Sequence, residues 1–264
     1  MTSKKVIAVF GATGTQGGSV AKAILEGKKF TVRAITRNVT HPNALALQDL
    51  GAEVVKGDLN DEASVEAAVK GAYGAFLVTN FWEGNSKKKE VYQGKLVADV
   101  DKRLGLKHVV FSGLVNVKRL TNGKLEVEHF DGKGEVEEYF WSIGVPMTSI
   151  HVPAYFENFL TVWKPMKASD GDYYTLVLPM GDKPMHGMSV ADVGAVVSSI
   201  LNSPAEFLGK TVNLSAEALT IQQYADVLSK ILGKEVRDAK ITVEAYEKLG
   251  FPHAKELANM FRFY

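Results

Sequence analysis

The 264-residue sequence contains no cysteine. This absence excludes disulfides, thiolate nucleophiles, cysteine-ligated zinc and thiol-based redox switches. Apolar runs as long as a membrane span are also missing, and the apolar run at residues 6–10 is too short for a signal peptide. We therefore expect a reducing, intracellular compartment, the cytoplasm, and no membrane partner.

Neither sign of charge is in excess, because 31 Lys and Arg residues are matched by 30 Asp and Glu residues, for a net charge of +1. Such a balance gives no reason to expect a nucleic-acid partner. The basic triplet Lys87-Lys88-Lys89 is interpreted as a solvated helix start. The six histidines are scattered and form no H-E-x-x-H motif, so we expect no metal site.

Strand-like and helix-like segments alternate through the first part of the chain. This alternation predicts an α/β fold, a Rossmann-type doubly wound parallel sheet, followed by a smaller α/β C-terminal annex. The expected strands are residues 6–10, 30–36, 53–55, 75–79, 108–112 and 147–152, and the expected helices are residues 20–26, 44–50, 62–69 and 86–104.

The regular alternation of strands and helices ends after residue 152, and this change predicts the domain organisation. We expect a dinucleotide-binding domain over residues 1–153, to which some later elements return, and an annex over residues 154–264. Residues 165–188 are interpreted as a loop, and Thr220 as the cap of a later helix. The apolar ending, residues 260–264, suggests that the natural protein continues further.

The first predicted strand runs into a glycine-rich turn. Gly11 permits a sharp exit from the strand, Gly14 lets a pyrophosphate approach the backbone, and Gly17 lets the next helix lie close. A helix start carries unpaired N–H groups and a partial positive charge, which bind phosphate. The spacing is G-x-x-G-x-x-G instead of G-x-G-x-x-G, and an ordinary glycine-rich turn is the alternative. The predicted cofactor contacts here are Gly11, Ala12, Thr13, Gly14, Thr15, Gln16 and Gly17.

The end of the second predicted strand indicates which dinucleotide binds. NAD-specific sites usually present an acidic residue there, but this chain has none between Glu26 and Asp49. Arg37 takes that position, and its planar fork of donors suits the 2′-phosphate of NADP. Asn38, Thr40 and His41 are candidate further donors. The alternative is a surface arginine that follows a strand.

Three further strand ends are candidates for the same crevice, because ligands lie outside the carboxyl ends of parallel strands. Asp58 and Leu59 follow the third strand and are placed beside the adenine. Thr79, Asn80 and Phe81 follow the fourth and are placed on the route to the nicotinamide, and Ser112 ends the fifth, where a hydroxyl could reach a reacting carbonyl.

A predicted helix carries the residues that bear on catalysis. His129 and Lys133 are four positions apart and therefore share a helix face. We predict that Lys133 donates to the nicotinamide ribose, and we keep a solvated surface lysine as the alternative.

These motifs together carry a family resemblance. They are residues 11–17, Arg37, Asp58, Thr79, Asn80, Lys133 and the run at residues 153–158. With them, nearly the whole chain resembles the NmrA-like family of atypical short-chain dehydrogenases/reductases. Tyr92 departs from the pattern, because it stands where a cofactor-contacting lysine is expected.

The resemblance implies NADP(H) binding and redox signalling through cofactor-dependent changes in shape and self-association. It implies a homodimer, protein partners such as an argininosuccinate synthase, and a cytoplasmic location that extends to the nucleus. The cofactor contacts that it adds are Tyr92, Tyr155, Phe156, Glu157 and Asn158.

Enzymatic members of the wider superfamily use a Tyr-x-x-x-Lys motif, in which the lysine lowers the tyrosine pKa. Here His129 stands at the tyrosine position, so we expect a sensor and not an enzyme, with His129, Lys133 and Ser112 as the only catalytic candidates. The alternative is an NADPH-dependent reductase of quinones or small carbonyl compounds. A scaffold with a vestigial cleft is the third reading.

Overall fold

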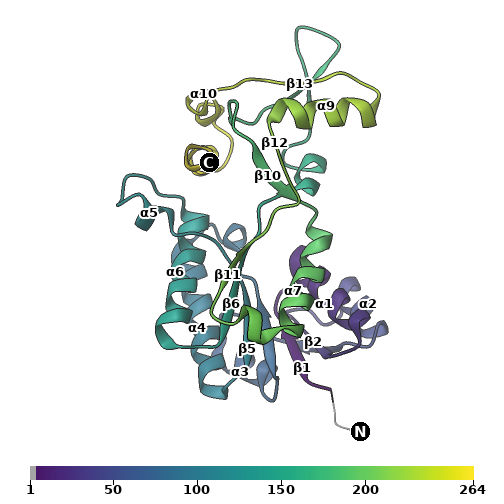
Figure 1. Cartoon of the computed structure of the whole chain (residues 1–264), viewed down its shortest axis with the longest axis vertical. Coiled ribbons are helices and arrows are strands. Elements are labelled where there is room, and N and C mark those ends of the chain that lie inside the picture. Colours follow the sequence, from purple (N-terminus) through teal and green to yellow (C-terminus); the bar gives the residue numbers. More distant parts are fainter. Residues whose placement is uncertain (1–3) are drawn as a thin grey trace. The chain divides into compact units, whose positions relative to one another are not determined.

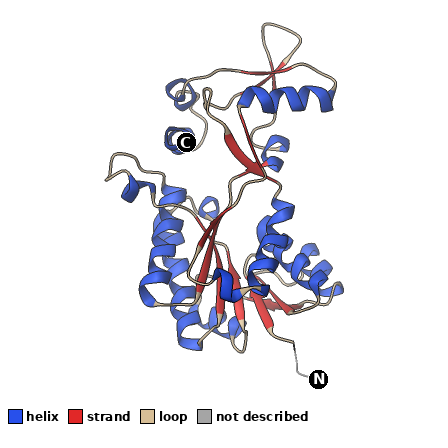
Figure 2. Ribbon diagram, viewed as in Figure 1, coloured by secondary structure: helices blue, strands red, loops and turns tan. Residues whose placement is uncertain are grey.

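The structure is a computed structural model that describes residues 4–264, and it contains two compact units (Figures 1 and 2). The first unit comprises the chain up to Asn116, Glu128–Val152 and Val190–Asn213. The second comprises Val117–Val127, Pro153–Ser189 and Leu214–Tyr264.

A seven-stranded parallel sheet forms the centre of the first unit, with the order β11-β6-β5-β4-β1-β2-β3. The order reverses between β1 and β4, which makes the carboxyl ends of these strands the topological switch point. The strands are β1 (Val6–Val9), β2 (Thr31–Thr36), β3 (Glu53–Lys56), β4 (Gly74–Leu77), β5 (His108–Gly113), β6 (Met147–His151) and β11 (Thr211–Asn213).

Helices cover both faces of this sheet, as continuous apolar strands require (Figure 1). On one face Phe10, Leu77 and Phe111 of the sheet pack with Val97 and Phe140 of the helices. The helices of that face are α3 (Glu62–Val69), α4 (Lys87–Leu104) and α6 (Glu128–Ile143). The other face is covered by α1 (Thr15–Gly27) and α7 (Val193–Asn202), with α2 (Pro42–Asp49) beside α1 and α8 (Pro204–Phe207) after α7. The predicted fold class is confirmed.

Two glycines allow the helix pairs of the first unit to pack closely. A Cβ on Gly94 of α4 would lie 2.4 Å from Val136 of α6. A Cβ on Gly194 of α7 would lie 2.2 Å from the carbonyl oxygen of Ser19 on α1, whose hydroxyl accepts from the Gly194 N–H at 3.0 Å. Helix α1 begins at Thr15 and not at the predicted residue 20, because Gly17 and Gly18 belong to its first turn.

The second unit is built on two three-stranded sheets, with the orders β12-β10-β7 and β13-β9-β8. The prediction of a loop over residues 165–188 is wrong, since β8, β9 and β10 lie there; their pairing partners include strands more than 30 residues later. The strands are β7 (Ala154–Tyr155), β8 (Met166–Lys167), β9 (Tyr174–Leu176), β10 (Met185–Met188), β12 (Glu217–Leu219) and β13 (Val236–Asp238).

The helices of the second unit are α5 (Val117–Leu120), α9 (Ile221–Leu232), α10 (Val243–Glu247) and α11 (Ala254–Phe263). Thr220 caps α9 in a complete capping box with Gln223, as predicted. Among residues 4–264, none of the helices combines the length and the apolarity that a bilayer crossing requires.

A buried acid interrupts the core side of α4. Asp101 is fully buried, and no residue in the described part of the chain donates a hydrogen bond to either of its carboxylate oxygens. Desolvation raises the pKa of Asp101 well above its usual range. The folded protein therefore keeps a proton on Asp101 at pH values where the unfolded chain releases it.

This proton predicts how stability depends on pH. As the pH rises above about 4, wild type should lose stability relative to Asp101→Asn by about 1.4 kcal/mol per pH unit, until Asp101 ionises in the folded state. Urea unfolding between pH 4 and 8 measures the difference. Asp99→Asn is the matched control, because Asp99 on the same helix is exposed and accepts from the Tyr139 hydroxyl at 2.7 Å. Parallel stability profiles for wild type and Asp101→Asn would contradict the prediction.

Candidate functional site

The turn after β1 depends on two glycines. Gly11 leaves the strand with φ +62°, and its carbonyl accepts from the Gly14 N–H at 2.9 Å. A Cβ on Gly17 would lie 2.2 Å from that same carbonyl oxygen. Because a Cβ cannot approach so closely, Gly17 is what allows α1 to start directly against the end of β1.

The N-terminus of α1 has the character of an anion site. Gly14 is its N-cap and has no side chain with which to cap it, and the first turn (Thr15, Gln16 and Gly17) is uncharged. The first N–H groups of a helix have no intrahelical partner and lie at the positive end of the helix dipole. By contrast, α4 and α9 are capped by the hydroxyls of Ser86 and Thr220.

A side chain that the sequence analysis missed holds this turn in place. Asn43 of α2 donates through Nδ2 to the carbonyl oxygen of Thr13 at 2.9 Å, and its own N–H donates to Nδ1 of His41 at 3.2 Å. His41 thus caps α2, and the structure shows no separate donor role for it. Ala12, which also belongs to this turn, is buried. A lone asparagine on a helix has no sequence signal that would have identified this role.

Arg37 follows β2 and forms an ion pair with Glu83 of the 3-10 helix η1 (Phe81–Glu83). The two side chains are 59% and 40% exposed, so the guanidinium remains open to solvent. The neighbouring Asn38 is used locally, because its Oδ1 accepts from the N–H and the hydroxyl of Thr40 at 3.0 and 2.7 Å. Glu83 was not among the predicted site residues.

Asp58 lies at the same edge of the sheet, after β3. The Asn60 N–H, which donates to its Oδ1 at 2.9 Å, lowers the pKa of Asp58, with smaller contributions from the Asn60 side chain, Arg37 and Lys89. The Asp58 carboxylate is therefore ionised at neutral pH, and hydrogen bonds from Asn60 within the same turn hold it in place. Leu59 packs against the core of the first unit.

Lys133 of α6 reaches the segment after β4. Its Nζ donates to the Thr79 carbonyl oxygen at 2.7 Å, to the Thr79 hydroxyl at 3.0 Å and to Glu90 Oε1 at 2.6 Å. Glu90 is 1% exposed and also accepts from the Thr79 hydroxyl at 2.7 Å. Oε2 of Glu90 is buried without a hydrogen-bond partner among residues 4–264. Lys133 is thus held in one position by a buried acid.

Glu90 could not be predicted as a site residue, because it directly follows the lysine triplet that resembles a solvated helix start. Its burial follows from the packing of α4 against α6, which includes the close contact at Gly94. A lysine-rich stretch gives no sign of such a partner.

His129 shares its helix face with Lys133, as the spacing predicts, but its surroundings are aromatic. Its ring centroid lies 5.0 Å from that of Trp82, 6.0 Å from Phe81 and 4.8 Å from Phe130. Asn80 accepts from the Trp82 N–H at 3.2 Å and so caps η1. His129 is 8% exposed. The imidazole thus packs among aromatic rings and is largely removed from solvent.

The other predicted site residues lie elsewhere. Ser112 is buried in β5 on the strand face that also carries His108, whereas Phe111 on the opposite face stacks on Phe140 of α6. Tyr92 is 55% exposed on α4. Four predicted contacts belong to the second unit and lie on β7 and the 3-10 helix η2 (Phe156–Leu160), namely Tyr155, Phe156, Glu157 and Asn158. Glu157 accepts a hydrogen bond from the Ser189 hydroxyl at 2.6 Å.

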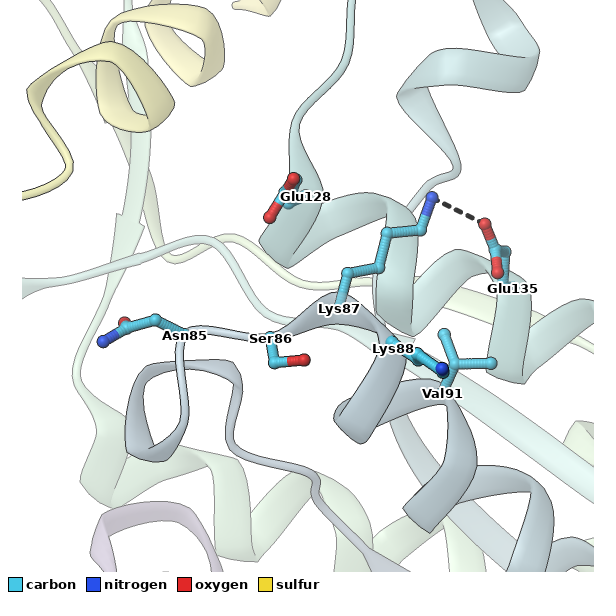
Figure 3. A pocket seen from close by; sticks show the side chains of 7 residues that line it. All are labelled: Asn85, Ser86, Lys87, Lys88, Val91, Glu128 and Glu135. Carbon is cyan, nitrogen blue, oxygen red and sulfur yellow. Dashed lines mark ion pairs between the residues drawn. The ribbon is translucent and has the colours of Figure 1, made fainter.

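An open hollow of about 550 Å³ lies at the start of α4, but none of the predicted site residues lines it (Figure 3). Figure 3 shows the Lys87 amine turned toward Glu135, with which it pairs at 2.6 Å. The lining residues are Asn85, Ser86, Lys87, Lys88, Val91, Glu128 and Glu135. This is a charged surface hollow, distinct from the strand ends that carry the glycine turn.

Curated relatives are similar to this chain in sequence over most of their length. An NmrA-like family domain-containing protein of Dictyostelium discoideum is 34% identical over 244 residues, 89% of this chain and 79% of its own. An NmrA-like family domain-containing oxidoreductase of Malbranchea aurantiaca is 34% identical over 259 residues, 91% of this chain and 76% of its own.

Solved structures give the same fold. A double mutant of NmrA is 26% identical with a TM-score of 0.83, over 99% of this chain and 81% of its own. NmrA in complex with NADP, described as a negative transcriptional regulator, is 24% identical with a TM-score of 0.82, over 99% and 82%. An Escherichia coli NADPH-dependent quinone oxidoreductase complexed with NADPH is 24% identical with a TM-score of 0.78, over 98% and 88%.

A family model provides the last comparison. The NmrA-like family matches residues 3–264, and so the predicted resemblance is confirmed at the level of the family. This chain, with a glycine turn at the switch point of a parallel sheet, belongs to the NmrA-like family.

Proposed function

We propose that this protein binds NADP(H) at the carboxyl edge of the first unit's sheet. The observation that carries the proposal is the close approach of Gly17 to the Gly11 carbonyl, which places the start of α1 beside the end of β1. That helix start has no side-chain cap and no charged residue in its first turn. The pyrophosphate would bind at this helix start, the 2′-phosphate at Arg37 and the nicotinamide ribose at Lys133. Structural neighbours crystallised with NADP or NADPH support the choice of cofactor.

We further propose that the protein is a redox sensor. Segments 130–140 and 257–264 resemble the animal NmrA-like redox-sensor protein HSCARG. The surroundings of His129 support this reading, because an imidazole packed among Phe81, Trp82 and Phe130 is poorly placed to replace the missing catalytic tyrosine. Binding would shift self-association toward or away from a homodimer. The partner would be a protein such as an argininosuccinate synthase, met in the cytoplasm or the nucleus.

A reductase of quinones or small carbonyl compounds is the second candidate. Curated relatives named oxidoreductases favour it, and so does the fixed ammonium of Lys133. NADPH would supply a hydride, while Lys133 would orient the ribose and His129 or solvent would supply the proton. Ser112, on a strand face that α6 does not cover, is the weakest of the three catalytic candidates.

The choice of NADP over NAD rests on Arg37. Arg37→Ala should weaken NADPH binding about 10- to 150-fold, since charged hydrogen bonds contribute about 1.5–3 kcal/mol, and should leave NADH binding nearly unchanged. Titration calorimetry with both nucleotides measures this. Arg103→Ala is the control, because Arg103 is a half-exposed arginine of the same unit, paired with Glu62 and Glu66. Equal losses for NADPH and NADH would refute the role of Arg37.

A sensor must couple its cofactor to its partner. A coupling of about 1–3 kcal/mol predicts a 5- to 150-fold change in dimer dissociation or in partner affinity when NADPH is added. Analytical ultracentrifugation measures the first quantity, and titration with argininosuccinate synthase the second. If neither changes, and NADPH is oxidised steadily in the presence of a quinone, the protein is a reductase and not a sensor.

The buried pair of Lys133 and Glu90 predicts a specific pattern of stability. Lys133→Met should lower the free energy of unfolding by about 3–5 kcal/mol, because Glu90 would keep a buried, unpaired charge. Adding Glu90→Gln should recover most of that loss. Lys87→Met is the matched control, because it breaks the more exposed α4–α6 pair with Glu135 and should cost about 1 kcal/mol or less. Equal losses for the two lysine variants in urea unfolding would contradict this pattern.

The double variant Lys133→Met/Glu90→Gln also serves the reductase test. Because it should remain folded, loss of quinone-dependent NADPH oxidation in this variant would reflect the missing ammonium and not unfolding.

A further inference from the structure

The ion pair of Arg37 and Glu83 joins two segments that are not neighbours in the sheet. Arg37 follows β2, and Glu83 lies in η1, which follows β4. In the sheet order β4-β1-β2, strand β1 lies between them. Both segments leave the carboxyl edge of parallel strands, so the pair crosses that edge at β1, where the turn of Gly11 begins.

The backbone that carries Glu83 is well anchored, whereas its carboxylate is not. Phe81 is buried and packs edge-on against Trp82, with ring centroids 5.1 Å apart, and Asn80 caps the turn. The Glu83 side chain is 40% exposed and that of Arg37 is 59% exposed. An exposed pair of this kind is held by about 1 kcal/mol or less. A stronger anion can therefore take the guanidinium without disturbing the core.

We propose that Glu83 is a specificity-determining residue, an internal anion that competes with the 2′-phosphate of NADP(H) for Arg37. This inference rests on the proposed binding of NADP(H). A phosphate monoester carries a larger charge than a carboxylate and matches the guanidinium fork, so it displaces Glu83. The 2′-hydroxyl of NAD(H) carries no charge and leaves the pair intact.

The competition gives NADP(H) an effect that NAD(H) lacks. Release of Glu83 removes the ion pair that joins η1 to Arg37 at the end of β2. Trp82 and Phe81 of η1 stay in contact with His129. Residues 80–83 follow Thr79 directly, and Thr79 accepts from Lys133. The 2′-phosphate is thus linked through one short segment to the residues proposed to lie at the nicotinamide end.

The test is a comparison of Glu83→Gln with wild type by titration calorimetry with NADPH and NADH. Glutamine keeps the size of the side chain and removes its charge. NADPH should bind about two- to fivefold tighter to Glu83→Gln, which is the upper part of the range for an exposed ion pair, while NADH binding stays unchanged. Glu53→Gln is the matched control. Glu53, on β3, is an exposed carboxylate that pairs at 2.8 Å with Arg33 of β2, the strand that Arg37 follows. It should leave both nucleotide affinities unchanged.

A double variant separates competition from simple repulsion. In the Arg37→Ala background, Glu83→Gln should no longer alter NADPH affinity, because there is no guanidinium to compete for. A gain that persists in that background, an equal gain for NADH, or weaker NADPH binding by Glu83→Gln would each overturn the inference. If wild type binds NADPH and Glu83→Gln binds it equally well, the inference alone fails. If wild type binds neither nucleotide, the proposed function fails with it.

Discussion

A carboxylate that is almost wholly removed from water needs a cation, and Glu90 obtains one from Lys133. Their contact joins α4 to α6, and the shared hydroxyl of Thr79 joins both helices to the end of β4. Desolvation makes this arrangement costly to change, because either charge alone would be buried without a partner. The lysine at the proposed ribose position is therefore fixed by the core and not by the ligand it would meet.

The two ends of the proposed cofactor site differ in how firmly their residues are held. At the nicotinamide end Lys133 and His129 are held by buried contacts, so the protein offers a preformed surface there. At the adenosine end Arg37 is exposed and its partner is exchangeable. A rigid end suits orientation of a ring, and an adjustable end suits recognition of a phosphate. The proposal for selectivity follows from the exposure of the Arg37–Glu83 pair at the adenosine end.

Much of the first unit could be predicted, because its buried strands are short continuous apolar runs that alternate with helix-like segments. The glycine turn, Arg37 and Lys133 could be named as candidates from the sequence, because each follows a strand or shares a helix face. Glu83, Glu90 and Asn43 were missed, because their roles arise from partners 46, 43 and 30 residues away. Short strands such as β8 and β9 were read as loop, since two or three residues show no alternation and β9 also pairs with the distant strand β13.

The sheet of the first unit is completed late in the chain. Strand β11 pairs with β6 after an interval of about 60 residues, most of which belong to the second unit, and Gly194 brings α7 against α1 just before it. During synthesis on a ribosome, α1 and the edge of β6 must therefore wait with their apolar surfaces uncovered while residues 153–189 emerge. The order of translation thus differs from the order of assembly, and during this interval the uncovered surfaces make the nascent chain prone to aggregation.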